Sequence, residues 1–190
     1  MFLDSIDIKH YTPNLADAIL ANEEIANNYS DLTLRKLFTQ LYPINTSIEA
    51  VLIKCATLNQ LYSTHVLAIT AMAEHILSIK DIDSRLTDGD ITLIDEIAHI
   101  PTIKNKFLSF ATKYCAMHQP KLFSIYDNNV RKVLKHYHKR KYSDDSLRNY
   151  ETYCQALSEL KSQYCLDKLD AWQLDKYLWQ LGKVIQQLKA

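Results

Sequence analysis

Glycine is nearly absent from this chain: Gly89 and Gly182 are the only two in 190 residues, where average composition would give roughly a dozen. Glycine supplies the positive φ angles of tight β-hairpin turns, so its scarcity disfavours folds built from short antiparallel strands. Neither G-x-G-x-x-G nor the Walker A pattern can be written with these two glycines, which lie far apart in the sequence, so glycine-rich phosphate loops are excluded. Leu, Ala, Lys, Gln and Glu are plentiful, and together these features favour an all-α fold.

Apolar residues recur at helical spacing between prolines and capping residues. We expect a single compact all-α domain over residues 1–190 with about eight to ten helices, no repeats and no low-complexity segment. The expected helices lie in residues 13–29, 30–42, 45–62, 63–79, 91–100, 104–118, 127–141, 144–165 and 168–188. Residues 81–90, "DIDSRLTDGD", are expected to form a turn, and the expected caps are Ser30 or Asp31 and Thr46 or Ser47.

The net charge of zero conceals a strong asymmetry along the chain. Ten Lys and Arg residues fall between Pro101 and Lys141, and Asp127 is the only acid among them. The rest of the chain therefore holds 12 basic and 21 acidic residues. This distribution is typical of a face that binds a polyanion, although a solvated basic helix face would produce the same pattern.

The four cysteines form no C-x-x-C pair and stand in apolar or helical contexts, where we expect small buried hydrophobic residues. The N-terminus does not resemble a signal peptide, and no apolar run is long enough for a membrane span. These features predict a cytoplasmic protein with no membrane partner. No His or Cys grouping has metal-ligand spacing, so no metal and no cofactor is expected.

Two residues in "FATKYCAMHQPKLFSIYDNNVRKVL" could carry chemistry. Asp127 follows an apolar run and opens the basic helix, where a carboxylate would cap the helix and interact favourably with its dipole. Lys113 stands among Phe110, Tyr114 and Cys115, so its amine is expected to be partly desolvated. A desolvated lysine can act as a nucleophile, but a lysine that extends its amine to solvent fits the same spacing.

Taken together, "IKNKFLSFATKYCAMHQPKLFSIYDNNVRKVL" resembles the core of the helix-hairpin-helix DNA glycosylases. The resemblance includes residues 111–113, residues 123–127 and the Val130–Arg131 pair, and it covers roughly residues 46–141, with residues 1–45 and 142–190 as flanking helices. It is closer to uncharacterised bacterial proteins with an 8-oxoguanine DNA glycosylase-like fold than to the well-known enzymes. The resemblance implies cleavage of the N-glycosidic bond of a modified or oxidised purine, with a possible lyase step at abasic sites, and double-stranded DNA with a flipped base as the partner.

The resemblance also implies roles for individual residues. Asp127 would activate water or stabilise the cationic sugar, and Lys113 would be the Schiff-base lysine. The DNA-binding residues would be Lys104, Lys106, Arg131, Lys132 and Lys135. The base pocket would be formed by Asn59, Gln60, Tyr62, Ser63, Tyr126, Trp172, Asp175 and Trp179.

The sequence departs from the family pattern in two places. The hairpin segment "HIPTIKNKF" contains no glycine, although glycines normally allow its backbone to hold a phosphate. The spacing from Lys113 to Asp127 is about one helical turn shorter than in the lyase members. The four-cysteine loop of some relatives has no counterpart, so no iron–sulfur cluster is expected. Two alternatives remain open: a catalytically inactive nucleic-acid-binding module and a helical protein-interaction scaffold.

Overall fold

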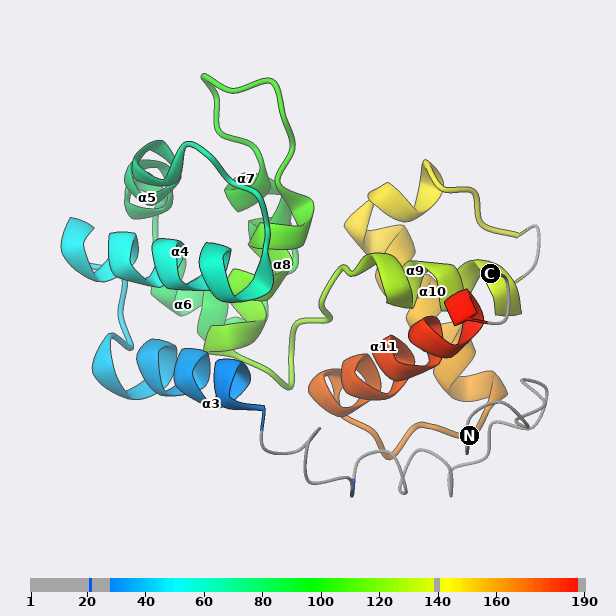
Figure 1. The fold of residues 1–190 in the computed structure, drawn as a ribbon. Helices are drawn as coiled ribbons and strands as arrows, with labels where there is room; N and C mark the ends of the chain where they lie inside the picture. Colours follow the sequence, from blue (N-terminus) through cyan, green and yellow to red (C-terminus); the bar gives the residue numbers. More distant parts are fainter. Residues whose placement is uncertain (1–20, 22–27, 139–140, 188–190) are drawn as a thin grey trace. The chain divides into compact units, whose positions relative to one another are not determined.

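The computed structural model describes residue 21, residues 28–138 and residues 141–187, with side chains as far as Lys183 in the last helix. All regular secondary structure in these residues is helical, which confirms the all-α prediction (Figure 1). The contacts divide these residues into two compact units, residues 28–125 and the residues from Tyr126 onward. A single domain over residues 1–190 therefore stays a prediction. The helix expected over residues 13–29 lies almost wholly outside the described residues.

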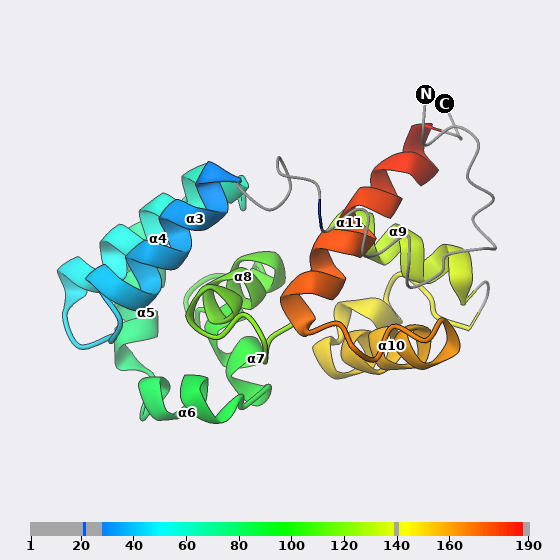
Figure 2. The same cartoon turned by 90° about the horizontal axis from the view of Figure 1, so that it is seen from below.

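The unit formed by residues 28–125 packs its helices around α4, α7 and α8. Its elements are α3 (Tyr29–Lys36), the π-helix η2 (Leu37–Leu41), α4 (Ile48–Tyr62), α5 (Ile69–Ser78), α6 (Ile82–Asp88), α7 (Thr92–Ala98) and α8 (Leu108–His118). Figure 2 shows α3 and α4 side by side. All eleven residues of α8 except Ser109 are buried, so this helix is the centre of the unit.

The helix ends in this unit only partly match the sequence predictions. Ser47 caps α4 through the backbone N–H of Ala50, as expected. The cap of α3 is Asn28, rather than Ser30 or Asp31, because its side chain accepts the first free N–H groups of the helix. The prediction of a turn at residues 81–90 was wrong, since α6 occupies most of it and ends at Gly89 with a φ of 71°.

The unit that begins at Tyr126 contains α9 (Asn128–Tyr137), the 3-10 turn η3 (Ser146–Arg148), α10 (Tyr150–Gln163) and α11 (Ala171–Gln187). Figure 1 shows α11 crossing α9, and these helices make extensive contact. Gly182 allows the close approach, because a Cβ there would lie 2.5 Å from the carbonyl oxygen of Asn129. No described helix is long and apolar enough to span a membrane. Cys165 is exposed and Cys154 is only partly buried, contrary to the expectation that all four cysteines are buried.

Gly182→Ala is expected to destabilise this unit by about 1–3 kcal/mol, because the new Cβ would push α11 away from the backbone of α9. In an open helix the same exchange would stabilise by about 1 kcal/mol. Urea unfolding of the wild type and the variant measures the difference. Ser158→Ala, at an exposed position of α10, should change the free energy of unfolding by less than about 0.5 kcal/mol. A stabilised Gly182→Ala variant would contradict the close packing of α9 and α11.

Candidate functional site

The side chain of Asp127 caps α9, as the sequence predicted. One carboxylate oxygen accepts the backbone N–H of Asn129 at 2.7 Å, and the backbone of Asp127 has the extended geometry usual for a cap. The carboxylate is neither buried nor fully exposed. As the cap of α9, it lies at the positive end of the helix dipole, where a negative charge interacts favourably.

Arg131 lies one turn further along α9 and is held from three sides. Its terminal nitrogens donate to the hydroxyl of Tyr126 at 3.1 Å and to the side-chain oxygen of Asn128 at 2.9 Å. Its Nε faces the carboxylate of Asp144 at 3.6 Å, and Lys135 pairs with the same carboxylate. The guanidinium also lies over the ring of Tyr126, 5.9 Å from the centroid. Two of the three cations predicted on α9 for DNA binding therefore share one acid, while Lys132 lies partly exposed.

Tyr153 of α10 brings together two predicted site residues from different elements. Burial, followed by the charges of Asp175 and Asp127, raises the pKa of the Tyr153 hydroxyl well above its usual value. The ring of Tyr153 packs edge-on against Tyr126 at 5.1 Å between centroids. The buried Tyr153 thus packs against Tyr126 and lies within the electrostatic influence of Asp127 and Asp175, and the sequence reasoning did not single it out.

Trp172 and Trp179 are both half-buried on α11. A lysine lies over each ring: Lys176 is 4.6 Å from the Trp172 centroid, and Lys183 is 3.5 Å from the Trp179 centroid. These are favourable cation–π distances. The stacking roles predicted for the two tryptophans stay predictions.

Lys113 belongs to the other unit, where it is buried with 5% exposure. Its amine donates to the hydroxyl of Ser109 at 2.8 Å and lies 5.6 Å from the centroid of the Tyr62 ring. The Tyr62 hydroxyl donates to the buried carboxylate of Asp31. The structure therefore brings Lys113 and Tyr62 together, and it adds Ser109 and Asp31, neither of which was predicted for the site.

Asn59, predicted for the base pocket, holds the loop that follows α4. Its side-chain oxygen accepts from the Thr64 hydroxyl at 2.7 Å and from the backbone N–H of Val66 at 2.9 Å, and its amide donates to the Val66 carbonyl at 3.2 Å. Gln60 and Ser63 are exposed, and Ser63 ends the helix with a φ of 48°. The side chain of Asn59 therefore fixes the conformation of the loop that follows α4.

The connector between α7 and α8 consists of residues 99–107, "HIPTIKNKF". In the resemblance to the helix-hairpin-helix proteins, this segment stands in the position of the hairpin. Figure 1 shows it as a projecting loop, and the N–H of Phe107 closes its base on the Ala98 carbonyl at 2.8 Å. Lys104 and Lys106 are exposed on it, and Lys106 pairs with Asp95 at 2.8 Å. Acids outside the basic run therefore neutralise part of its charge.

A polar network buried in the unit of residues 28–125 was not predicted. Lys54 of α4 has 0% exposure. Its amine contacts the carbonyl oxygens of Tyr42 and Ile44 at 3.1 and 3.2 Å and the side-chain oxygen of Asn45 at 2.5 Å. The Asn45 amide donates to Asp83 at 2.6 Å. An ammonium has three N–H donors, and these three oxygens satisfy them.

Burial lowers the pKa of Lys54 to about 8, although Asp83 opposes that shift. The fourth neighbour of the amine is Nε2 of His118, at 3.3 Å. Burial, followed by the charge of Lys54, lowers the pKa of His118 to about 3, so this imidazole is neutral at pH 7. Tyr114 completes the network by donating to the Asn45 side-chain oxygen at 2.5 Å. The sequence did carry one signal: Lys54 shares a helix face with Val51 and Leu58.

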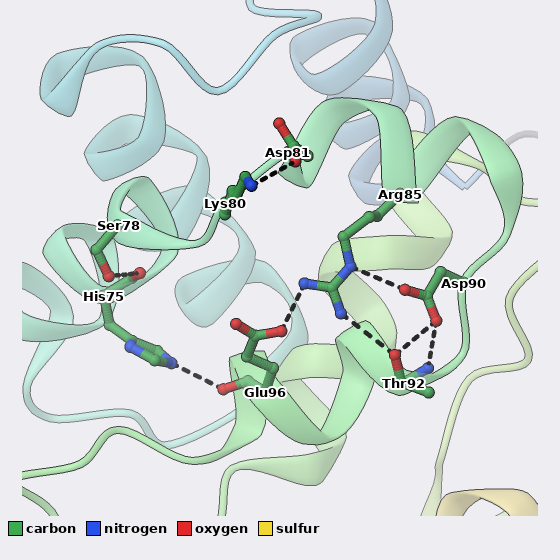
Figure 3. A network of polar contacts seen from close by, with 8 residues as sticks. All are labelled: His75, Ser78, Lys80, Asp81, Arg85, Asp90, Thr92 and Glu96. Atoms are coloured by element: carbon green, nitrogen blue, oxygen red, sulfur yellow. Dashed lines mark hydrogen bonds and ion pairs between the residues drawn. The ribbon is translucent and has the colours of Figure 1, made fainter.

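A second network, at the junction of α6 and α7, is more exposed (Figure 3). Arg85 donates to Asp90 at 2.8 Å, to Glu96 at 2.5 Å and to the Thr92 hydroxyl at 3.2 Å. His75 of α5 meets the carbonyl of Glu96 at 2.7 Å. Hydrogen bonds from Thr92 and Arg85 lower the pKa of Asp90 to about 2. The network holds three helices together. No group of three or more His, Cys, Asp or Glu in the described part of the chain could hold a metal.

Comparison with known proteins places this chain in a family. The model of the HI_0787_N family, described as an N-terminal domain, matches residues 8–122. An uncharacterized protein of Haemophilus influenzae is 40% identical over 162 residues, covering 81% of this chain and 77% of the relative. The chain belongs to the HI_0787_N family. No solved structure matches it.

The matched segment of the HI_0787_N family contains the whole network around Lys54 as well as Lys113 and Tyr62. It ends at residue 122, before Asp127 and α9. The two candidate catalytic residues therefore differ in their relation to the family: Lys113 lies within its matched domain, and Asp127 lies beyond it.

Lys54→Met is expected to cost about 3–5 kcal/mol of stability, because the carbonyl oxygens of Tyr42 and Ile44 and the buried side chain of Asn45 lose their donor. Urea unfolding at pH 7 gives the value. Lys80→Met removes a lysine whose side chain is 91% exposed, and it should change stability by less than about 0.5 kcal/mol. A cost below about 1 kcal/mol for Lys54→Met would contradict the network.

His118 should make the protein sensitive to acid. Its pKa is about 3 in the folded chain and about 6.5 when unfolded, so the unfolded state binds more protons between these values. The stability that His118 contributes is therefore present above pH 6.5 and is lost as the pH falls towards 3. Between pH 6 and 4, the wild type should lose up to about 1.4 kcal/mol per pH unit more than His118→Phe. Urea unfolding at several pH values tests this, and equal slopes would contradict it.

Proposed function

We propose that this protein binds DNA through the polar side of α9 and that Asp127 is the carboxylate of a DNA glycosylase reaction on a modified or oxidised purine. The proposal depends mainly on one observation. Asp127 is a partly accessible carboxylate at the start of α9, and the same helix carries Arg131, Lys132 and Lys135. The sequence resemblance to helix-hairpin-helix DNA glycosylases supports the same assignment.

The chemistry requires a negative charge that is already in place when the base leaves. Cleavage of an N-glycosidic bond places positive charge on the sugar, and a fixed carboxylate stabilises that charge without reorganising. Asp127 is suited to this role because the N–H of Asn129 orients it at the start of the helix. The carboxylate can either face the cationic sugar or accept a proton from the attacking water.

The side chains of α9 can hold the DNA backbone near that carboxylate. Val130, Val133 and Leu134 are buried, so Arg131 and Lys132 lie on the polar side, and Lys135 follows one turn after Arg131. Arginine and lysine contacts with phosphates position a protein on DNA without reading its sequence. The lyase step would belong to Lys113, whose amine is already desolvated.

A catalytically inactive DNA-binding module is the second candidate. It is favoured by the loop of residues 99–107, which contains no glycine and so lacks the usual backbone grip on a phosphate. In that case the cations of α9 would bind DNA and Asp127 would serve only as the cap.

Asp127→Asn separates the two candidates, because asparagine caps a helix about as well as aspartate but carries no charge. We expect the variant to keep its DNA affinity and to release a modified base at least about 100-fold more slowly. Base release is measured on duplexes containing single oxidised or alkylated purines, and affinity by fluorescence anisotropy between 50 and 200 mM salt. Borohydride trapping with Lys113→Ala tests the lyase step.

Asp170→Asn is the matched control, since Asp170 and Gln173 form the capping box of α11 in the same unit. It should behave as the wild type. Base release that is unaffected by Asp127→Asn, or absent from every duplex, would overturn the enzymatic proposal and leave the binding module. The absence of salt-dependent DNA binding would overturn both candidates and favour a helical interaction scaffold.

A further inference from the structure

The carboxylate of Asp144 lies close to several cationic side chains. Its carboxylate pairs with Nζ of Lys135 and lies 3.6 Å from Nε of Arg131. Arg148, in η3, also contributes to the charge around it. The Asp144 side chain is 49% exposed, and so the pair lies at the surface. A single anionic group is therefore held between two cations of α9, and Arg148 adds to the positive charge around it.

We propose that this point is a phosphate-binding site and that Asp144 is its internal competitor. The DNA part of the inference rests on the proposed function. In the free protein the carboxylate of Asp144 takes the place of a phosphate oxygen between Arg131 and Lys135. A backbone phosphate of DNA displaces it when the polar side of α9 binds.

The guanidinium of Arg131 is arranged for such a ligand. Tyr126 and Asn128 hold its two terminal nitrogens, which directs its Nε towards Asp144. A side chain already fixed in this way loses less conformational entropy when it binds an anion. Lys135 adds a mobile point charge one turn away, a combination suited to a phosphate.

Displacement of Asp144 is energetically feasible. An exposed ion pair contributes only about 0–1 kcal/mol, because water and salt screen it. A phosphate offers more acceptor oxygens than a carboxylate, and its hydrogen bonds with arginine and lysine are charge-assisted. Asp144 therefore weakens phosphate binding without preventing it, and removal of its charge should strengthen binding.

The test compares Asp144→Asn with Asp145→Asn by fluorescence anisotropy on a labelled duplex. Both substitutions remove one negative charge from adjacent exposed residues, but only Asp144 forms ion pairs with described residues of α9. We expect Asp144→Asn to tighten binding about tenfold, the effect of one charge-assisted hydrogen bond. The slope of log affinity against log salt should steepen by about 0.9 for each phosphate gained. Asp145→Asn should tighten binding less than threefold.

Equal gains in DNA affinity for the two variants would overturn the inference, because they would show a general charge effect. It would also be overturned if the wild type binds DNA and Asp144→Asn binds it no more tightly. Failure of every variant to bind DNA would instead overturn the proposed function. A second arm then decides on the site itself: inorganic phosphate is titrated into the Asp144→Asn variant while amide chemical shifts are recorded. Shifts at Arg131 and Lys135 support a site for free phosphate, and their absence overturns the inference.

Discussion

The ammonium of Lys54 links most of the unit formed by residues 28–125. It reaches the connector before its own helix through Tyr42 and Ile44. Asn45 extends the link, since its oxygen accepts from Lys54 and its amide donates to Asp83 of α6. A side-chain amide thus stands between an ammonium and a carboxylate, and each charge polarises it in the same sense. Isolation of either charge would be costly in a buried site, and the amide provides the compensation without direct ion pairing.

The Lys54 network also affects the charge and the packing of His118 in α8. Burial already disfavours a charge on His118, and the ammonium of Lys54 beside its Nε2 adds to the effect, so the imidazole stays neutral. A neutral ring can pack as an aromatic side chain, and Phe38 of η2 meets it edge-on at 5.0 Å. Phe38 packs against Tyr114 in the same way at 5.1 Å. The π-helical turn that carries Phe38 is therefore fixed by the same polar centre that orders the connector.

The sequence predicted what local patterns control. The helical class follows from composition and periodicity, and the caps Ser47 and Asp127 follow from residue type at a helix start. The Lys54 network could not be found in this way, because its partners are far apart in the sequence: Asn45 and Asp83 are 38 residues apart, and Lys54 and His118 are 64 apart. A lysine within a helix is expected to extend to solvent, and only the apolar register of Lys54 argued otherwise. Packing also turned residues 82–88 into a helix, although their polar composition is typical of a turn.

The charge of the basic run between Pro101 and Lys141 could not be predicted from the sequence alone either. A window along the chain gives ten cations and one acid, but charge acts through distance in space. In the folded chain, three acids outside this window pair with its cations. Asp95 pairs with Lys106, Asp144 with Arg131 and Lys135, and Glu159 with Lys141. The charge that a polyanion would meet is therefore smaller than the window implies, and part of it becomes available only when Asp144 is displaced. The α9 surface of Arg131, Lys132 and Lys135 is therefore a partly neutralised face rather than a uniformly basic one. Since exposed ion pairs open at little cost, the proposed displacement of Asp144 would restore the charge of Arg131 and Lys135.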